Sequence, residues 1–200
     1  MKHTACLQRG VSMIEVLVAL LVLSIGLLGV AATVAKSSRF AAGAWAQSAG
    51  VNSLSDIAER LRSSPNSSNA NFTLTADYAT QRADIDAGTV VVVTDCETVA
   101  CIPAQAAAFH IATWRQEIER TLPGAAGWIS PLSSAATESR ATSFELAVMW
   151  FDKSNTDGSG TANAALVCTG AETGIEQRRC CPVATNAAAG VRCTRMVLVP

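Results

Sequence analysis

The feature that most constrains this 200-residue sequence is an uncharged apolar stretch near its N-terminus. Residues Val16–Ala35 read VLVALLVLSIGLLGVAATVA and contain no charged side chain. A helix of twenty residues is about 30 Å long, which matches the hydrocarbon core of a bilayer. The apolar region of a conventional secretory signal is shorter. We therefore predict a membrane-spanning helix at this position.

The composition limits what the rest of the chain can be. Half of the residues are hydrophobic and only 16% are charged, which excludes an intrinsically disordered chain. The length allows one modest domain with an additional segment. The formal net charge of -1 provides no overall field that would attract nucleic acid.

A single carboxylate, Glu15, lies within the apolar run that begins at Val11. An unpaired charge at depth in a membrane costs about 2 to 3 kcal/mol or more. The sequence leaves two interpretations open. Glu15 either extends to water at the membrane edge or pairs with a specific positive charge.

The run from Arg9 to Leu20, RGVSMIEVLVAL, resembles the processing site of type IV prepilins. The resemblance implies that prepilin peptidase cleaves after Gly10 and that the new N-terminus, Val11, is methylated. Most members of the family have Phe where this chain has Val11. Glu15 corresponds to the family's glutamate and is implied to act in subunit assembly.

Two further segments are similar to minor pilins of the PilV type. They are Ile14–Gly29 within the apolar stretch and the element from Trp114 to Gly124, which contains WRQ and LPG. The resemblance implies an α+β, pilin-like fold. In this fold a long N-terminal α-helix, with a membrane-spanning first half, packs on a small antiparallel β-sheet head.

The predicted organisation follows the chain in four parts. Apolar residues at spacings of three and four continue after Ala35, and no proline occurs between Val11 and Ser64, so one helix is expected from about Ser12 to Ser63. The parts are a leader peptide (1–10), a transmembrane or filament-core half of the helix (11–35), an amphipathic half (36–64) and a globular disulfide-containing head (65–200).

Within the head the patterns predict one polar surface loop, one helix and four strands. The loop is 65–88, and the helix is Ala104–Leu122, with Ile111, Trp114, Ile118 and Leu122 on one face. The expected strands are Thr89–Thr94, a buried β-branched run, and Phe144–Phe151, Ala164–Cys168 and Met196–Val199.

Cleavage after Gly10 would remove Cys6 and leave an even number of cysteines, which are Cys96, Cys101, Cys168, Cys180, Cys181 and Cys193. An exported, oxidising location favours disulfides over zinc for these residues. Cys96 and Cys101 are the first pair expected, because only a short segment separates them and can form a closed loop. The sequence leaves the pairing of the other four open.

Other candidate sites have simpler explanations. The loop Asp152–Gly160 offers several oxygens, but aligning Gly158 with the EF-hand glycine puts Lys153 at the first ligand position, so a hairpin turn is predicted. His110 is expected to pack or form a surface hydrogen bond. Glu117 and Glu119 are two residues apart on a predicted helix and face different directions. No catalytic motif is found, so we expect neither enzymatic activity nor a cofactor.

The resemblance therefore leads to a minor type IV pilin as the predicted function. Its implied partners are other minor pilins, the major pilin, prepilin peptidase, the inner-membrane assembly platform and membrane lipid. The implied location is the inner membrane, with one span and the head in the periplasm, and then the pilus. The alternatives are a type II secretion pseudopilin, a pilus-tip adhesin or DNA-uptake receptor, and a membrane-anchored thiol oxidoreductase, which would need a CxxC motif that the sequence lacks. Cleavage would remove Lys2 and Arg9 but no acidic residue, so the mature charge disfavours nucleic acid.

Overall fold

The computed structural model describes residues 12–64, 71–92, 94–132 and 143–199. The chain divides into two compact units, Met1–Ala42 and Gly43–Pro200. Helix α1 (Met13–Ser63) contributes to both units, and its observed bounds confirm the long helix expected from about Ser12 to Ser63. The chain has the predicted α+β fold, in which a long N-terminal apolar helix is followed by a small antiparallel sheet.

The first unit is the N-terminal part of α1. Every described residue from 12 to 42 is exposed. The hydroxyls of Ser24, Thr33 and Ser38 donate hydrogen bonds to the carbonyls of Leu21, Val30 and Ala35, at 2.8 to 2.9 Å. These polar side chains are therefore satisfied within the helix itself, which suits an apolar environment. By length and composition, α1 is apolar enough to cross a membrane.

The second unit is built on a three-stranded antiparallel sheet with the order β1-β2-β3. Its strands are β1 (Ala126–Pro131), β2 (Phe144–Phe151) and β3 (Val191–Leu198). In the central strand, residues Leu146–Trp150 are all buried, although successive side chains point to opposite faces. Both faces of the sheet are therefore covered, which explains the continuous apolar run in β2.

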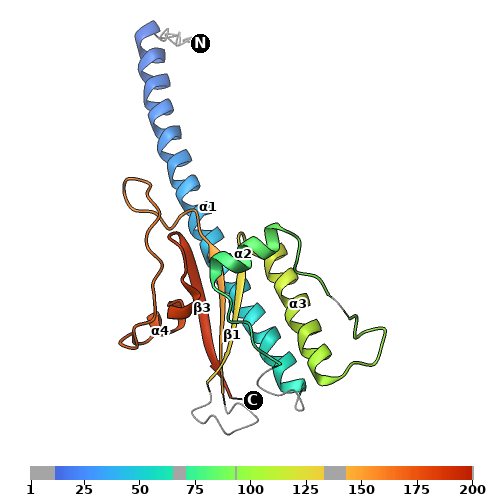
Figure 1. The fold of residues 1–200 in the computed structure, drawn as a ribbon. Helices are drawn as coiled ribbons and strands as arrows, with labels where there is room; N and C mark the ends of the chain where they lie inside the picture. The colour runs from blue at the N-terminus through green and yellow to red at the C-terminus, as the bar shows by residue number, and fades with distance from the viewer. Residues whose placement is uncertain (1–11, 65–70, 93, 133–142, 200) are drawn as a thin grey trace, which may run out of the picture. The chain divides into compact units, whose positions relative to one another are not determined.

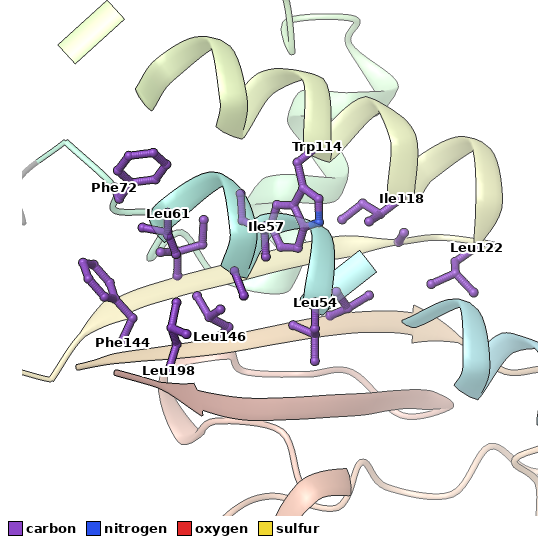
Figure 2. Close-up of a cluster of buried hydrophobic side chains, with 14 of the residues drawn as sticks. Leu54, Ile57, Leu61, Phe72, Trp114, Ile118, Leu122, Phe144, Leu146 and Leu198 are labelled. Carbon is purple, nitrogen blue, oxygen red and sulfur yellow. The ribbon is translucent and has the colours of Figure 1, made fainter. Parts of the chain in front are cut away.

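The C-terminal part of α1 and helix α3 (Pro103–Thr121) cover one face of the sheet (Figure 1). Figure 2 shows the side chains that fill this layer, with Leu54, Ile57 and Leu61 contributed by α1. Trp114, Ile118 and Leu122, from the predicted apolar face of the second helix, are buried among them, and Ile111 is partly buried against the same cluster. The sheet contributes Phe144, Leu146, Val148, Trp150 and Leu198.

The opposite face of the sheet carries a second buried cluster. It contains the alternate side chains of the strands, together with Tyr78 and residues from the segment that precedes β3. That segment includes the short helix α4 (Glu176–Arg179) and a 3₁₀ turn, η1 (Val183–Thr185). Cys181 from this segment and Cys193 from β3 are both buried in the cluster.

Residues 65–88 were predicted to be a surface loop, which is wrong for much of the described part, 71–88. Phe72 is fully buried, and α2 (Tyr78–Asp86) begins where the Asp77 carboxylate accepts a hydrogen bond from the Thr80 N–H at 2.8 Å. This N-cap satisfies a free helix N–H group and allows a polar sequence to start a helix. The side chain of Gln81 from α2 is also buried and bonds the N–H and C=O of Gly127 on β1.

The strand predicted at Thr89–Thr94 is also wrong. Residues 89–92 and 94 form no strand, and Val91 is exposed. β-Branched residues favour strands only where a neighbouring strand and a covering layer exist. Here Val90 instead accepts a side-chain hydrogen bond from Gln116 of α3 at 3.1 Å.

The remaining strand predictions were partly right. Phe144–Phe151 is confirmed as β2, whereas Ala164–Cys168 makes only an isolated parallel bridge between Val167 and Cys181. The strand expected at Met196–Val199 begins earlier, at Val191. Strand β1 was not predicted, because AGWISP starts with small residues, ends in proline and shows no clear alternation.

Candidate functional site

The N-terminal unit presents a carboxylate at the start of an exposed apolar helix. Glu15 lies in the first turn of α1, and its N–H donates to the carbonyl of Ser12 at 3.1 Å and to the Ser12 hydroxyl at 3.4 Å. The Glu15 side chain is exposed. A carboxylate in the first turn also interacts favourably with the positive end of the helix dipole. Gly10 and Val11, the predicted cleavage and methylation sites, lie outside the described residues.

The apolar surface of this unit is too extensive for a helix that remains in water. Its large exposed side chains are Met13, Ile14, Val16, Leu17, Val18, Leu20, Leu21, Val22, Leu23, Ile25, Leu27, Leu28, Val30, Val34 and Phe40. They lie on all sides of the helix, and Val16–Ala35 contains no charge. A helix that is apolar all round requires lipid or other helices around it.

Residues 6–31 match a family model for the prokaryotic N-terminal methylation motif. The chain carries a prepilin-type N-terminus. The match includes Gly10, Val11 and Glu15 and extends over most of the apolar stretch, so the motif and the exposed helix form one continuous feature. No curated protein and no solved structure matches the chain.

In the second unit, the six cysteines form three disulfides. Cys96 is bonded to Cys101, Cys168 to Cys180 and Cys181 to Cys193, with Cα–Cα distances of 4.9 to 5.5 Å. The adjacent residues Cys180 and Cys181 therefore have different partners. Cys180 closes a loop back to Cys168, and Cys181 attaches the same segment to β3. Among the described residues, no group of three or more His, Cys, Asp or Glu side chains is arranged to hold a metal ion.

We expect the Cys181–Cys193 bridge to contribute more stability than Cys96–Cys101. Replacing Cys181 and Cys193 together by alanine should lower the free energy of unfolding by about 3 to 5 kcal/mol, because a loop constraint and buried contacts are lost together. Replacing Cys96 and Cys101 is the matched control. That pair closes a shorter loop at a less buried position, and about 2 kcal/mol is expected.

The measurement is denaturant unfolding of the full chain in detergent, followed by tryptophan fluorescence. Equal losses of stability in the two double variants would contradict the larger contribution expected of Cys181–Cys193.

In the unmodified protein from an oxidising compartment, alkylation without reductant should label none of the six cysteines. Labelling of two or more of them would contradict the assignment of three disulfides.

His110 packs against aromatic rings. Its ring stacks on Phe72 with centroids 6.4 Å apart and meets the edge of Phe109 at 5.7 Å. Burial lowers the pKa of His110 below its usual value, and the positive charge of Arg60 acts in the same direction. Among the described residues, the buried Nδ1 atom has no hydrogen-bond partner. This environment favours a neutral imidazole that acts in packing.

Glu117 and Glu119 engage arginines on two different helices. Glu119 pairs with Arg82 of α2, and a Glu117 oxygen lies 3.7 Å from an Arg60 nitrogen of α1. The two carboxylates therefore connect α3 to separate neighbours and do not form an acid–base pair.

The aspartates of the loop Asp152–Gly160 are used within the loop and by β3. The Asp157 carboxylate accepts hydrogen bonds from the N–H groups of Ser159 and Thr161, both at 2.9 Å, and from the Ser159 hydroxyl. These bonds lower the pKa of Asp157, with the Ser159 hydroxyl contributing most. Asp152 accepts from Arg192 of β3 at 2.6 Å. An antiparallel bridge between Thr156 and Ala162 closes the hairpin turn that the sequence predicts.

Proposed function

We propose that this chain is a minor type IV pilin of the PilV type, which prepilin peptidase processes and which helps to prime pilus assembly near the pilus tip. The observation that carries the proposal is the continuity of the methylation motif at residues 6–31 with an apolar helix whose described residues from 12 to 42 are all exposed. A processed N-terminus followed by a helix that needs apolar neighbours is what helix-packed assembly requires.

The proposed organisation divides the chain at 10, 35 and 64. Residues 1–10 are the leader, 11–35 span the membrane before assembly, 36–64 are the amphipathic half of the helix, and 65–200 form the head. The burial of Leu54, Ile57 and Leu61 in the core of the second unit supports a structural role for the second half of the helix. The head is placed in the periplasm, where its disulfides can form.

The mechanism of assembly is transfer of the apolar helix from lipid into a bundle of similar helices. This transfer has little net hydrophobic cost, because the helix surface is apolar in both environments. The single carboxylate, Glu15, then sets the register by pairing with the methylated ammonium group at Val11 of a neighbouring subunit. No cofactor takes part, and the partners are minor pilins, the major pilin and the assembly platform.

The PilV type is proposed from the resemblance of the Trp114–Gly124 element, and residues of this element contribute to the core of the head. Trp114 and Leu122 are buried in the main core, and the Pro123 carbonyl accepts a hydrogen bond from the Phe151 N–H at 2.9 Å. Gly124 has a φ of +59°, where a side chain would be strained and close to Tyr78.

A type II secretion pseudopilin is the alternative, because it shares the processing motif. Recovery of the protein in sheared pili distinguishes the two functions, since a pseudopilin would be absent from that fraction.

Intact-mass and N-terminal analysis of the membrane form tests the processing step. We expect a chain that begins at Val11 and carries one methyl group on its N-terminus. Gly10→Leu is the matched variant and should retain residues 1–10. A chain that begins at Lys36, as cleavage of a secretory signal after the small residues Thr33–Ala35 would produce, would contradict the proposal. So would an intact Met1 in cells with active prepilin peptidase.

A further inference from the structure

The outer edge of β3 has backbone groups whose direction follows from the sheet register. On β1, the N–H and C=O of Ile129 bond Leu74 at 3.0 and 2.9 Å, so they point away from β2. Hydrogen-bonded and non-hydrogen-bonded pairs alternate in antiparallel sheets. Leu146, which faces Ile129, therefore directs its backbone groups to its β3 partner, Met196.

The next residues on β3 consequently point their backbone groups outward. These residues are Cys193, Arg195 and Val197, which alternate with residues bonded to β2. Among the described residues, no backbone group of these three has a hydrogen-bond partner outside the sheet. At the other edge, Leu74 and Gln81 bond the outward groups of β1. Cys193 is buried, so the sheet is closed at β1 and open at the part of β3 where Arg195 and Val197 lie.

A groove of about 710 Å³ lies along the open edge, between α1 and α4. It is lined by Gln47, Val51, Leu54 and Ser55 of α1, by Ile175, Gln177, Arg178 and Arg179 at α4, and by Thr194, Arg195, Met196 and Val197 of β3. Thr194 and Met196 project towards the α1 face of the sheet, whereas Arg195 and Val197 project to the other face. The groove therefore follows the edge itself.

The lining combines exposed apolar side chains with positive charge. Val51, Ile175 and Val197 are all exposed. The lining contains three arginines and no carboxylate. Arg195 pairs with Glu145 at 3.1 Å, whereas Arg178 and Arg179 make no ion pair with any described residue. The groove can therefore accept negative charge beside an apolar strand.

We propose that the open edge of β3 binds an extended acidic segment of a partner protein, which adds a fourth strand to the sheet. The outward N–H and C=O groups of Arg195 and Val197 would bond its backbone, and alternate side chains would meet the apolar lining or the arginines. Arg192 and Arg195 lie on β3, which carries no carboxylate, so pairing with β3 of a second copy would bring arginines together. This interaction surface does not depend on the function proposed above.

The test uses a fluorescent eight-residue peptide in which valine alternates with glutamate, titrated with the full chain in detergent and followed by anisotropy. Val197→Pro removes an outward N–H without removing a bond to β2, and proline is tolerated at such edge positions. We expect binding to weaken about tenfold or more in this variant, since a hydrogen bond is lost and the ring obstructs the edge. Val197→Thr keeps the N–H and is the matched control, with binding within about twofold.

Two further comparisons keep the test independent of how well the proline variant folds. A peptide N-methylated on alternate backbone nitrogens should bind the unmodified protein about tenfold more weakly, because it cannot complete the ladder. The double variant Arg178→Gln, Arg179→Gln should weaken binding about fivefold. The control is Arg120→Gln, an exposed arginine on α3 outside the groove, which should change nothing.

Several results would overturn the proposal. One is that the N-methylated peptide binds as tightly as the unmodified peptide, and another is that Arg120→Gln weakens binding as much as the Arg178→Gln, Arg179→Gln double variant does. A peptide with lysine in place of glutamate that binds as tightly as the glutamate peptide would also overturn it. The last is self-association of the chain through β3 without peptide binding.

Discussion

Replacing Trp114 by alanine is expected to lower the free energy of unfolding of the head by about 4 kcal/mol. Trp114 is fully buried between α3, α1 and the sheet, and its indole N–H donates to the carbonyl of Ser53 at 2.9 Å. The variant removes one of the two tryptophans in the layer and leaves the Ser53 carbonyl without this donor. Denaturant unfolding of the full chain in detergent measures the change.

Trp45→Ala is the matched control, because Trp45 is 57% exposed on the same helix that carries Ser53. Its loss should change stability by no more than about 0.5 kcal/mol. Gly127→Ala tests the same contact from the sheet side. A Cβ at Gly127 would lie 2.3 Å from Trp114, so this small addition should also destabilise the head, by about 1 to 3 kcal/mol. Similar stabilities for Trp114→Ala and Trp45→Ala would show that α3 is not held by this packing.

Glu15→Leu is expected to leave the protein in the membrane fraction and nearly absent from sheared pili. On the proposed function, the carboxylate pairs with the N-terminal ammonium of a neighbouring subunit in the fibre. Removing one partner of a buried pair leaves the other charge uncompensated, at a cost of about 3 to 5 kcal/mol. In the membrane Glu15 lies near the edge of the apolar stretch and reaches water, so insertion and cleavage should proceed as in the unmodified chain.

Two variants accompany Glu15→Leu. Glu15→Asp retains the charge and should restore part of the incorporation. Ser24→Leu adds a similar apolar side chain within the helix and should be incorporated normally, because Ser24 bonds only its own helix among the described residues. Western blots of membrane and sheared-fibre fractions provide the measurement. Equal incorporation of Glu15→Leu and the unmodified chain would remove the pairing role and leave a residue that simply extends to water.

The elements predicted correctly are those whose own residues determine them. The long helix follows from an apolar pattern without proline, the second from an apolar face that ends at Pro123, and β2 from a run that is buried on both faces. The run Thr89–Thr94 has strong β propensity, but its described residues form no strand, because pairing is decided by segments far away in the sequence. The polar helix α2 depends on the capping of Asp77 and on burial of Gln81 against β1, neither of which a local pattern specifies.

The residue types of the candidate site could be predicted from the sequence, whereas their arrangement in space could not. Glu15 and the cysteines could be identified from their residue types and surroundings. The separate partners of Cys180 and Cys181 follow from how the segment between α4 and β3 folds back on the sheet, which the sequence does not specify. The open edge of β3 was missed because it depends on strand order, and β1, which sets that order, was not predicted.

The position of β3 as the last described element affects how the head is completed during synthesis. This strand provides one of the two neighbours of β2, contributes Leu198 to the core with Ile57 and contains Cys193. Until the ribosome has made and released it, the apolar faces of α1 and β2 remain partly uncovered, and Cys181 has no partner. The sheet, the main core and the Cys181–Cys193 bridge are therefore all completed by the same strand, so the head cannot be finished in part.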